Sequence, residues 1–379
     1  MTTPSRAARP SSRRGHSKFW YGRVPRISVD IRDGLAVVIF LFALLAGACS
    51  PVSPTASPTP SLSAAIASYL RDVSNDDGFS GAVLVAKDFV PFASAVNGLG
   101  DRQRAWYIST QTNLNVASIT KLFTAVAIGK LVDEGKVSLG DPLSKFLPSY
   151  PKPMGDRITI AMLLAHTAGT GDYFSDPGYP RVKDSFGSLG ELLAAVDISV
   201  PAGTVPGATY KYSSTGYLLL GAVIEKASGR DFYDYMDNEI FGKAGIAGGF
   251  LANTDAEHSL RQFALGYLPD GTTNWHALPA RGTPASDAYV SAKDLVAFHR
   301  ALASGLLVRP ETLQKLVLEP SPAGRSPLPM TANEWLGAEP GASAVFAMTD
   351  SGYTIVVLAN VSGVARPIAD RLLAMLRGN

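Results

Sequence analysis

Cysteine is almost absent from this sequence of 379 residues, which contains only Cys49. A single cysteine excludes an intrachain disulfide, so stability must come from a hydrophobic core, for which a chain that is 46% hydrophobic has ample material. The five histidines show no spacing typical of a metal site, and the sequence has no phosphate-binding loop or dinucleotide fingerprint. We therefore expect no metal and no cofactor.

Basic residues are not spread evenly along the chain. Residues 1–33 hold eight Lys and Arg against two Asp, a net charge of +6, whereas the whole chain carries +2. The remaining residues therefore carry −4, so the part that can form a core is mildly acidic. This balance argues against a nucleic-acid-binding surface.

No hydrophobic run is long enough for a membrane-spanning helix. The longest, residues 35–48, has 14 residues, and a spanning helix needs about 20. Such a run after a basic segment is typical of a signal peptide, predicted here over residues 1–48. Cys49 follows directly, and residues 46–49 (Ala-Gly-Ala-Cys) resemble a bacterial lipobox. We expect Cys49 to carry a lipid that anchors the protein on the outer face of the cell membrane; the alternative is a simple cleaved signal or a short anchor with an incidental cysteine.

The rest of the chain predicts one fold with strands at its two ends. Residues 49–62 are rich in Pro, Ser and Thr and predict a flexible tether. Strand patterns cover residues 81–87 and 91–96 near the start and 343–348 and 353–360 near the end, with mainly helical signals between them. We predict an α/β fold in which an antiparallel sheet built from both chain ends is flanked by helices, with an inserted mainly helical domain. The predicted limits are 63–140 and 285–379 for the α/β lobe and 141–284 for the helical lobe.

Capping residues predict where several helices begin and end. Ser291 and Asp294 form a capping-box pattern that begins a helix running through Ala303. Gly216 begins a helix that Gly229 ends. The other helices are predicted over 63–73, 158–166, 188–196 and 230–242, and from Asp141-Pro142 and Pro367 onward.

Ser118 stands three residues before Lys121, at the start of an apolar stretch that ends at Gly135. In a helix this spacing puts both side chains on one face. The stretch is too apolar for a surface helix, so we expect Lys121 to be buried, which lowers its pKa and lets it act as a base for Ser118. An isolated pair with this spacing also occurs in ordinary surface helices, so the assignment needs support from other motifs.

Five segments supply that support: Phe79-Ser-Gly-Ala-Val-Leu-Val-Ala, Ala117-Ser-Ile-Thr-Lys-Leu-Phe-Thr-Ala, Leu163-Leu-Ala-His-Thr-Ala-Gly169, Tyr212-Ser-Ser-Thr-Gly-Tyr-Leu-Leu-Leu-Gly221 and Ile355-Val-Val-Leu-Ala-Asn360. In this order they resemble the penicillin-recognising serine hydrolases, which include class C β-lactamases, D-Ala-D-Ala peptidases and related esterases. The resemblance runs from about residue 63 to the end of the chain.

The resemblance implies a role for each matching residue. Ser118 takes the place of the nucleophile, Lys121 that of its partner, and Tyr212 that of the tyrosine that moves protons between them and the leaving group. The backbone N–H groups of Ser118 and Ala338 take the place of the oxyanion hole. His166 lies within one of the motifs, and we expect it to be structural.

The sequence departs from the family pattern at two of the implied substrate-binding positions, Ser214, Trp335 and Gly337. Ser214 stands where the family usually has Asn, and Trp335 stands where its third motif has Lys or His. The stretch before Trp335 is short, so a strand of the family pattern is expected to be missing or replaced by a Pro-rich loop over residues 319–329.

The role implied for Tyr212 needs a pKa below the ordinary value for tyrosine, which is about 10. Nearby cations would lower that pKa, because they stabilise the phenolate. We expect Lys121, with Lys211 as a second candidate, to supply the positive charge.

We predict a cell-envelope serine hydrolase that forms an acyl-enzyme at Ser118 on small ester, amide or β-lactam-like substrates, including peptidoglycan-derived ones. Trp335 has no charge to hold a substrate carboxylate, so esterase activity is favoured over β-lactamase activity. The alternative is a catalytically degenerate member that binds peptidoglycan fragments or a protein partner. Ser214 and Trp335 favour this alternative, whereas the intact Ser118, Lys121 and Tyr212 favour the enzyme.

Overall fold

The computed structural model of the protein describes residues 61–253, 263–317 and 334–377. The predicted signal peptide, Cys49, nearly all of the tether and the Pro-rich loop over 319–329 lie outside the described residues. Within the three described ranges, no helix is long and apolar enough to cross a membrane.

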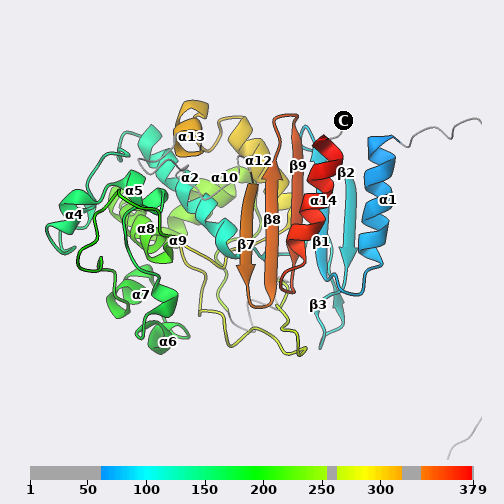
Figure 1. The fold of residues 1–379 in the computed structure, drawn as a ribbon, viewed down its shortest axis with the longest axis horizontal. Coiled ribbons are helices and arrows are strands. Elements are labelled where there is room, and N and C mark those ends of the chain that lie inside the picture. Colours follow the sequence, from blue (N-terminus) through cyan, green and yellow to red (C-terminus); the bar gives the residue numbers. More distant parts are fainter. Residues whose placement is uncertain (1–60, 254–262, 318–333, 378–379) are drawn as a thin grey trace, which may run out of the picture. The chain divides into compact units, whose positions relative to one another are not determined.

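A five-stranded antiparallel sheet joins the two ends of the described chain (Figure 1). The strand order is β2-β1-β9-β8-β7. The early strand β1 pairs with the late strand β9 along its whole length, from Gly81 opposite Ala359 to Lys87 opposite Tyr353. The predicted antiparallel sheet built from both chain ends is therefore confirmed. The strands are β1 (Gly81–Lys87), β2 (Val90–Asn97), β7 (Glu334–Glu339), β8 (Ala342–Met348) and β9 (Tyr353–Ala359).

The central strands are apolar on both faces because helices cover both faces. Val83 and Val85 of β1 belong to a cluster with residues of α1 and α14, which Figure 1 shows together on one face of the sheet. Leu84, which points to the opposite face, belongs to the main core with residues of α2 and α12. Burial on both faces explains why these strands read as continuous apolar runs. The four helices are α1 (Leu62–Ser74), α2 (Thr120–Asp133), α12 (Ala292–Ala303) and α14 (Ala365–Arg377).

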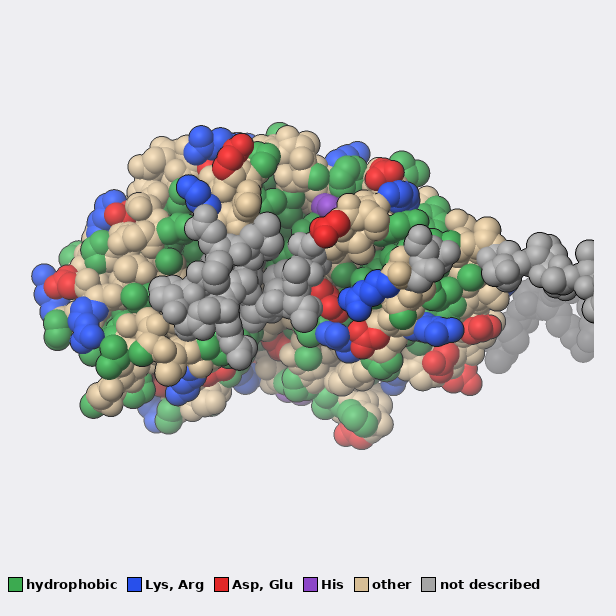
Figure 2. Space-filling model, turned by 45° about the horizontal axis from the view of Figure 1, so that its top comes forward, with side chains coloured by type: hydrophobic (Ala, Val, Ile, Leu, Met, Phe, Trp, Pro, Cys, Tyr) green, Lys and Arg blue, Asp and Glu red, His purple; other side chains and the backbone are tan. Residues whose placement is uncertain are grey.

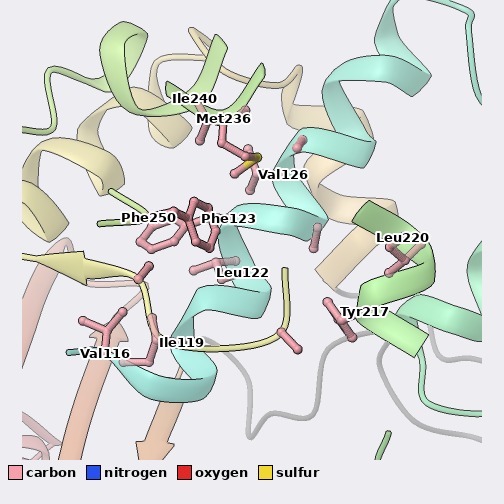
Figure 3. Close-up of a cluster of buried hydrophobic side chains, with 14 of the residues drawn as sticks. Val116, Ile119, Leu122, Phe123, Val126, Tyr217, Leu220, Met236, Ile240 and Phe250 are labelled. Carbon is pink, nitrogen blue, oxygen red and sulfur yellow. The ribbon is translucent and has the colours of Figure 1, made fainter. Parts of the chain in front are cut away.

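Helices α2 and α8 (Ser214–Ser228) form the centre of the helical part of the molecule. Both are buried over most of their length, as the apolar sequence of the α2 region predicted. Helix α8 ends at Gly229, whose left-handed φ of 71° suits a residue without a Cβ. The close-up in Figure 3 shows Phe123 of α2 beside Phe250 in the main core.

Short elements complete the fold. Strand β5 (Leu114–Asn115) pairs with β6 (Tyr289–Val290), and this pairing brings the segment before Ser118 next to the segment before α12. A second short pair is formed by β3 and β4. The remaining elements are β3 (Leu99–Asp101), β4 (Trp106–Tyr107), η1 (Ala117–Ile119), α3 (Leu143–Phe146), α4 (Met154–Arg157), α5 (Ile160–Leu164), η2 (Tyr173–Ser175), α6 (Tyr179–Val182), α7 (Leu189–Ala195), α9 (Phe232–Tyr235), the π-helical η3 (Met236–Phe241), α10 (Gly242–Ala244) and α13 (Pro310–Val317).

Several predicted helix boundaries need correction. The helix predicted over 158–166 is limited to α5, because His166 has a left-handed φ of 55° that no α-helix accommodates. The helix predicted over 230–242 begins as α9 and continues as the π-helical turn η3. The last helix begins before Pro367, which lies in its first turn, where a missing N–H is tolerated. The capping box of Ser291 and Asp294 is confirmed.

Charged side chains are interspersed on the face shown in Figure 2, where Lys and Arg lie close to Asp and Glu. Among the described residues, Glu239 pairs with Lys130, Arg230 and Lys243. The coloured residues of this face do not form a single basic field of the kind that binds nucleic acid.

Candidate active site

The predicted nucleophile, Ser118, lies in the single 3-10 turn η1, between strand β5 and helix α2. The turn begins at Ala117, whose left-handed φ of 45° is strained for a residue with a Cβ. The Asn115 side chain stabilises this conformation, because its Oδ1 accepts a hydrogen bond of 2.7 Å from the Ala117 N–H. Ser118 therefore precedes the long helix, which begins at Thr120.

Three predicted site residues from distant parts of the chain meet at this turn. Ser118 Oγ lies 2.8 Å from Tyr212 Oη, and either oxygen can donate the hydrogen bond. Lys121 Nζ donates to Ser118 Oγ at 3.2 Å and to the Ala285 carbonyl oxygen at 2.6 Å. The i, i+3 spacing thus places the amine beside the hydroxyl, and the loop before α8 brings in the tyrosine.

Lys121 is only 3% exposed, as its position in an apolar helix predicted. Burial lowers its pKa from 10.5 to about 8, because an interior of low polarity disfavours the charged ammonium. The carboxyl groups of Glu339, Asp172 and Asp287 oppose this effect. An appreciable share of Lys121 is then neutral near pH 8 and able to accept a proton.

The predicted pKa shift of Tyr212 is wrong in direction. Burial raises the pKa of Tyr212 to about 12, although the hydrogen bond with Ser118 partly opposes the rise. Neither Lys121 nor Lys211 contributes to the shift, and Lys211 is exposed. At neutral pH the phenol therefore keeps its proton and can donate it, which leaves Lys121 as the better proton acceptor.

His166 supports the tyrosine from behind. Its ring is buried and stacked on the Tyr212 ring, with 4.5 Å between centroids and an angle of 26°. Nδ1 accepts a hydrogen bond of 3.1 Å from the Ser213 N–H. Burial, together with the charge of Lys121, lowers the pKa of His166 to about 3, so the ring stays neutral. These contacts agree with the structural role expected for His166.

Strand β7 lies at the edge of the sheet against the turn that carries Ser118. A Cβ at Gly337 would stand 2.1 Å from the Val116 carbonyl oxygen, so only glycine allows this approach. Ala338 is the next residue on β7. The contact places the two residues predicted to form the oxyanion hole, Ser118 and Ala338, on adjoining elements.

Among the described residues, no group of three His, Cys, Asp or Glu side chains could hold a metal ion. His258, one of the five histidines, lies outside them.

A family model described as Beta-lactamase matches residues 66–377, which is most of the chain. The chain belongs to the β-lactamase family. A putative penicillin-binding protein, PbpX, of Bacillus subtilis is 28% identical over 301 residues, a match that covers 77% of this chain and 72% of that protein. Penicillin-binding protein 4* of the same species is 29% identical over 206 residues, or 53% of this chain and 44% of that protein.

Solved structures show the same fold. A penicillin-binding protein from Bacillus halodurans is similar with a TM-score of 0.69 and 30% identity, covering 81% of this chain and 99% of that one. A D-amino acid amidase from Ochrobactrum anthropi is 20% identical, with a TM-score of 0.68 over 84% of this chain and 99% of that one. At this lower identity the likeness concerns the fold of the β-lactamase family and not the activity.

Ser214 and Trp335, at which this β-lactamase-family chain departs from the family pattern, do not lie where we predicted. Ser214 is 2% exposed in the first turn of α8. Trp335 is 5% exposed, and its ring packs on Phe346 of β8 at 5.4 Å between centroids. The substrate contacts implied for Ser214 and Trp335 are therefore corrected, because both side chains are buried. On β7 the exposed apolar side chain is Leu336.

Three polar residues at the site were not predicted from the sequence: Asn115, Asp287 and Glu339. Asn115 holds the turn of Ser118, and the two carboxyl groups act on Lys121. The sequence could have indicated Glu339. It alternates with Trp335 and Gly337 on the inward-facing side of β7, where a charged residue is unexpected. Asn115 and Asp287 carry no comparable signal, because each depends on a contact 172 residues away.

Proposed function

We propose that this β-lactamase-family protein is a cell-envelope serine hydrolase that forms an acyl-enzyme at Ser118. The observation that carries the proposal is the meeting of a hydroxyl, a buried amine and a phenol, with Ser118 Oγ 2.8 Å from Tyr212 Oη and 3.2 Å from Lys121 Nζ. A serine hydroxyl needs a neighbouring proton acceptor to become a nucleophile, and neutral Lys121 is such an acceptor.

The proposed reaction begins when Ser118 Oγ attacks the substrate carbonyl carbon and its proton passes to Lys121. A C–O bond forms, and the backbone N–H groups of Ser118 and Ala338 stabilise the negative carbonyl oxygen. The intermediate then expels the leaving group, which takes a proton from the Tyr212 hydroxyl, and Lys121 returns its proton to Tyr212. A water molecule releases the acyl group from Ser118 in the same manner.

The proposed substrates are small esters, with peptidoglycan-derived amides and β-lactams turned over more slowly. Trp335, Leu336 and Gly337 of β7 have no cationic side chain with which to hold a carboxylate. A hydrogen bond to a charged group contributes about 1.5–3 kcal/mol, so its loss disfavours carboxylate substrates by roughly tenfold to a hundredfold. Neutral esters need no such contact, and the exposed Leu336 offers them an apolar surface.

Covalent labelling tests the proposed nucleophile. A fluorophosphonate or a fluorescent penicillin should attach to the protein, and mass mapping of the peptide should place the adduct on Ser118. Ser118→Ala should abolish labelling and ester hydrolysis and leave the unfolding temperature nearly unchanged. An adduct on another residue would refute the assignment, and a wild type without any adduct would favour a degenerate member that only binds peptidoglycan fragments or a protein.

The ratio of two activities tests the proposed substrate class. The wild type should have a higher kcat/KM for a short p-nitrophenyl ester than for nitrocefin. Leu336→Lys places a cation on the exposed face of strand β7 and should shift the ratio toward nitrocefin. Leu336→Gln changes the same side chain without adding a charge, so it controls for the loss of the apolar surface. Efficient nitrocefin hydrolysis with slower ester turnover would contradict the proposal.

We also propose that a lipid on Cys49 holds the protein at the cell membrane. The support for this is the sequence alone: a basic segment, an apolar run of 14 residues and a lone cysteine that follows it directly.

A further inference from the structure

Two carboxyl groups outside the proposed proton-transfer set meet in the interior near Lys121. Asp287 is 2% exposed, and its Oδ1 accepts a hydrogen bond of 2.8 Å from the Asn115 side chain. Glu339 ends strand β7, and its Oε1 accepts a hydrogen bond from the Ser286 hydroxyl, which is itself fully buried. Ser286 directly precedes Asp287, so the two carboxyl groups lie close together, and the charge of Asp287 raises the pKa of Glu339.

The closeness of the two carboxyl groups favours a shared proton. Asp287 Oδ2 is buried and has no hydrogen-bond partner among the described residues, and a protonated Glu339 would supply the donor that it lacks. Burial raises the pKa of both groups, and the neighbouring Asp287 raises that of Glu339 further. Two facing carboxylates in the interior cannot both be ionised, so the pair holds one proton and one negative charge at neutral pH.

The same loop that carries Asp287 also binds the catalytic helix. The Ala285 carbonyl accepts a hydrogen bond from Lys121, and the Ala288 N–H donates one to the Thr120 hydroxyl. Through Asn115, Asp287 is linked to the strained Ala117 that precedes Ser118. Asp287 itself has a left-handed φ of 70°, a conformation that Asp and Asn tolerate better than most residues.

We propose that Asp287 and Glu339 are positioning residues that carry one shared proton, and that their single negative charge sets the charge state of Lys121 while Asp287 holds the Ser118 turn through Asn115. This inference rests on the proposed function, since it concerns the base of the same reaction. It assigns a task to two carboxyl groups that the reaction itself does not use.

Other ionisable groups face Lys121 or the pair from the surrounding elements, and most of them remain neutral. His166 is neutral because burial lowers its pKa to about 3, and the tyrosines are neutral because burial raises theirs. Asp172 is the further carboxylate that acts on Lys121. The neighbouring groups are Asp172, His166, Tyr173, Tyr179, Tyr212, Tyr217 and Tyr289.

Amide substitutions separate the charge of the pair from its hydrogen bonds. Asp287→Asn and Glu339→Gln each mimic the protonated partner, so each single variant keeps one negative charge and the hydrogen-bond pattern. The double variant removes the charge. The measurement is the pH dependence of kcat/KM for a neutral ester. The single variants should keep the acid limb of the wild-type profile. In the double variant this limb should lie about one pH unit lower, so kcat/KM at acidic pH should be about tenfold higher.

The pH dependence of unfolding tests the pair without any activity. A carboxyl group with a raised folded-state pKa contributes stability at low pH that is lost as the pH rises through that pKa. Urea unfolding of Ser118→Ala with and without Glu339→Gln should therefore show a steeper loss of stability with rising pH, beginning above the ordinary Glu pKa of about 4.5, when Glu339 is present. Equal slopes would overturn the shared proton.

The pH profile of kcat/KM can also contradict the proposal. If the acid limb of the profile shifts as far in each single variant as in the double variant, the proposed role of the single negative charge is wrong. If the wild type does not react at Ser118 at all, the proposed function fails, and the unfolding slopes still report on the pair.

Discussion

Lys121 illustrates, at the scale of single residues, how burial changes the chemistry of a side chain. The same amine on a surface helix would be fully protonated at neutral pH, whereas here burial lowers its pKa to about 8. Tyr212 moves in the opposite direction, because burial disfavours the phenolate. Burial thus favours Lys121 as the proton acceptor and Tyr212 as the proton donor of the proposed reaction.

The pH dependence of activity follows from Lys121. Its neutral form is the base, so kcat/KM for a neutral ester should rise with pH through an apparent pKa of about 8. The increase should approach tenfold per pH unit below that value, and Lys121→Ala should abolish it. A profile that is flat from pH 5 to pH 9 would contradict this assignment.

Tyr212→Phe removes one hydroxyl and leaves the ring that stacks on His166. Loss of a proton donor at the leaving group should lower kcat by about 10²–10⁴-fold. The unfolding temperature should change little, because the stacked ring remains in place. Steady-state kinetics will measure kcat, and thermal unfolding will measure stability. An unchanged kcat would show that Tyr212 takes no part in the reaction.

At the scale of elements, the site depends on the close contact between strand β7 and the turn η1. Gly337 allows the strand to reach the Val116 carbonyl oxygen, and Asn115 of β5 fixes the turn from the other end. The nucleophile is therefore held between three elements that are far apart in the sequence: β5, β7 and the start of α2.

Gly337→Ala tests this contact. The new Cβ would lie 2.1 Å from a backbone oxygen, so the strand or the turn must move. Overpacking of this kind costs about 1–3 kcal/mol of unfolding free energy and should also displace Ser118 and reduce labelling. Leu336→Ala on the same strand is the control for stability, because its side chain is 49% exposed and its loss should change stability by less than about 0.5 kcal/mol. Full labelling of Gly337→Ala at wild-type stability would argue against a tight contact.

At the scale of the whole molecule, the fold brings the two ends of the described chain into one sheet. Strand β1 lies between β2 and the late strand β9, and helices from both ends cover one face. The segment before α1 carries the predicted tether and Cys49, which lie outside the described residues.

Fractionation tests the anchor proposed for Cys49. The wild type should require detergent for extraction from membranes, and Cys49→Ala should be soluble or unprocessed. One acyl chain binds a membrane only marginally, so stable anchoring requires the several chains of a lipoprotein. A wild type that is soluble without detergent and carries no lipid on Cys49 would refute the anchor.

The sequence by itself determined the features that depend on local spacing and periodicity. The apolar runs at both ends predicted the strands of one sheet, and glycine at 229 predicted the end of α8. The spacing of Ser118 and Lys121 predicted that amine and hydroxyl would meet, because residues three apart share one face both in a 3-10 turn and in an α-helix.

Only the tertiary structure decided which side chains face the core and which charges meet. Trp335 and Ser214 are buried because distant elements pack on them, and the pKa of Tyr212 rises because the same surroundings exclude water from its phenol group. Asp287 and Glu339 come together because the loop before α12 and the end of β7 meet at Lys121. Burial and electrostatic contact depend on residues far away in the chain, so local sequence patterns do not contain them.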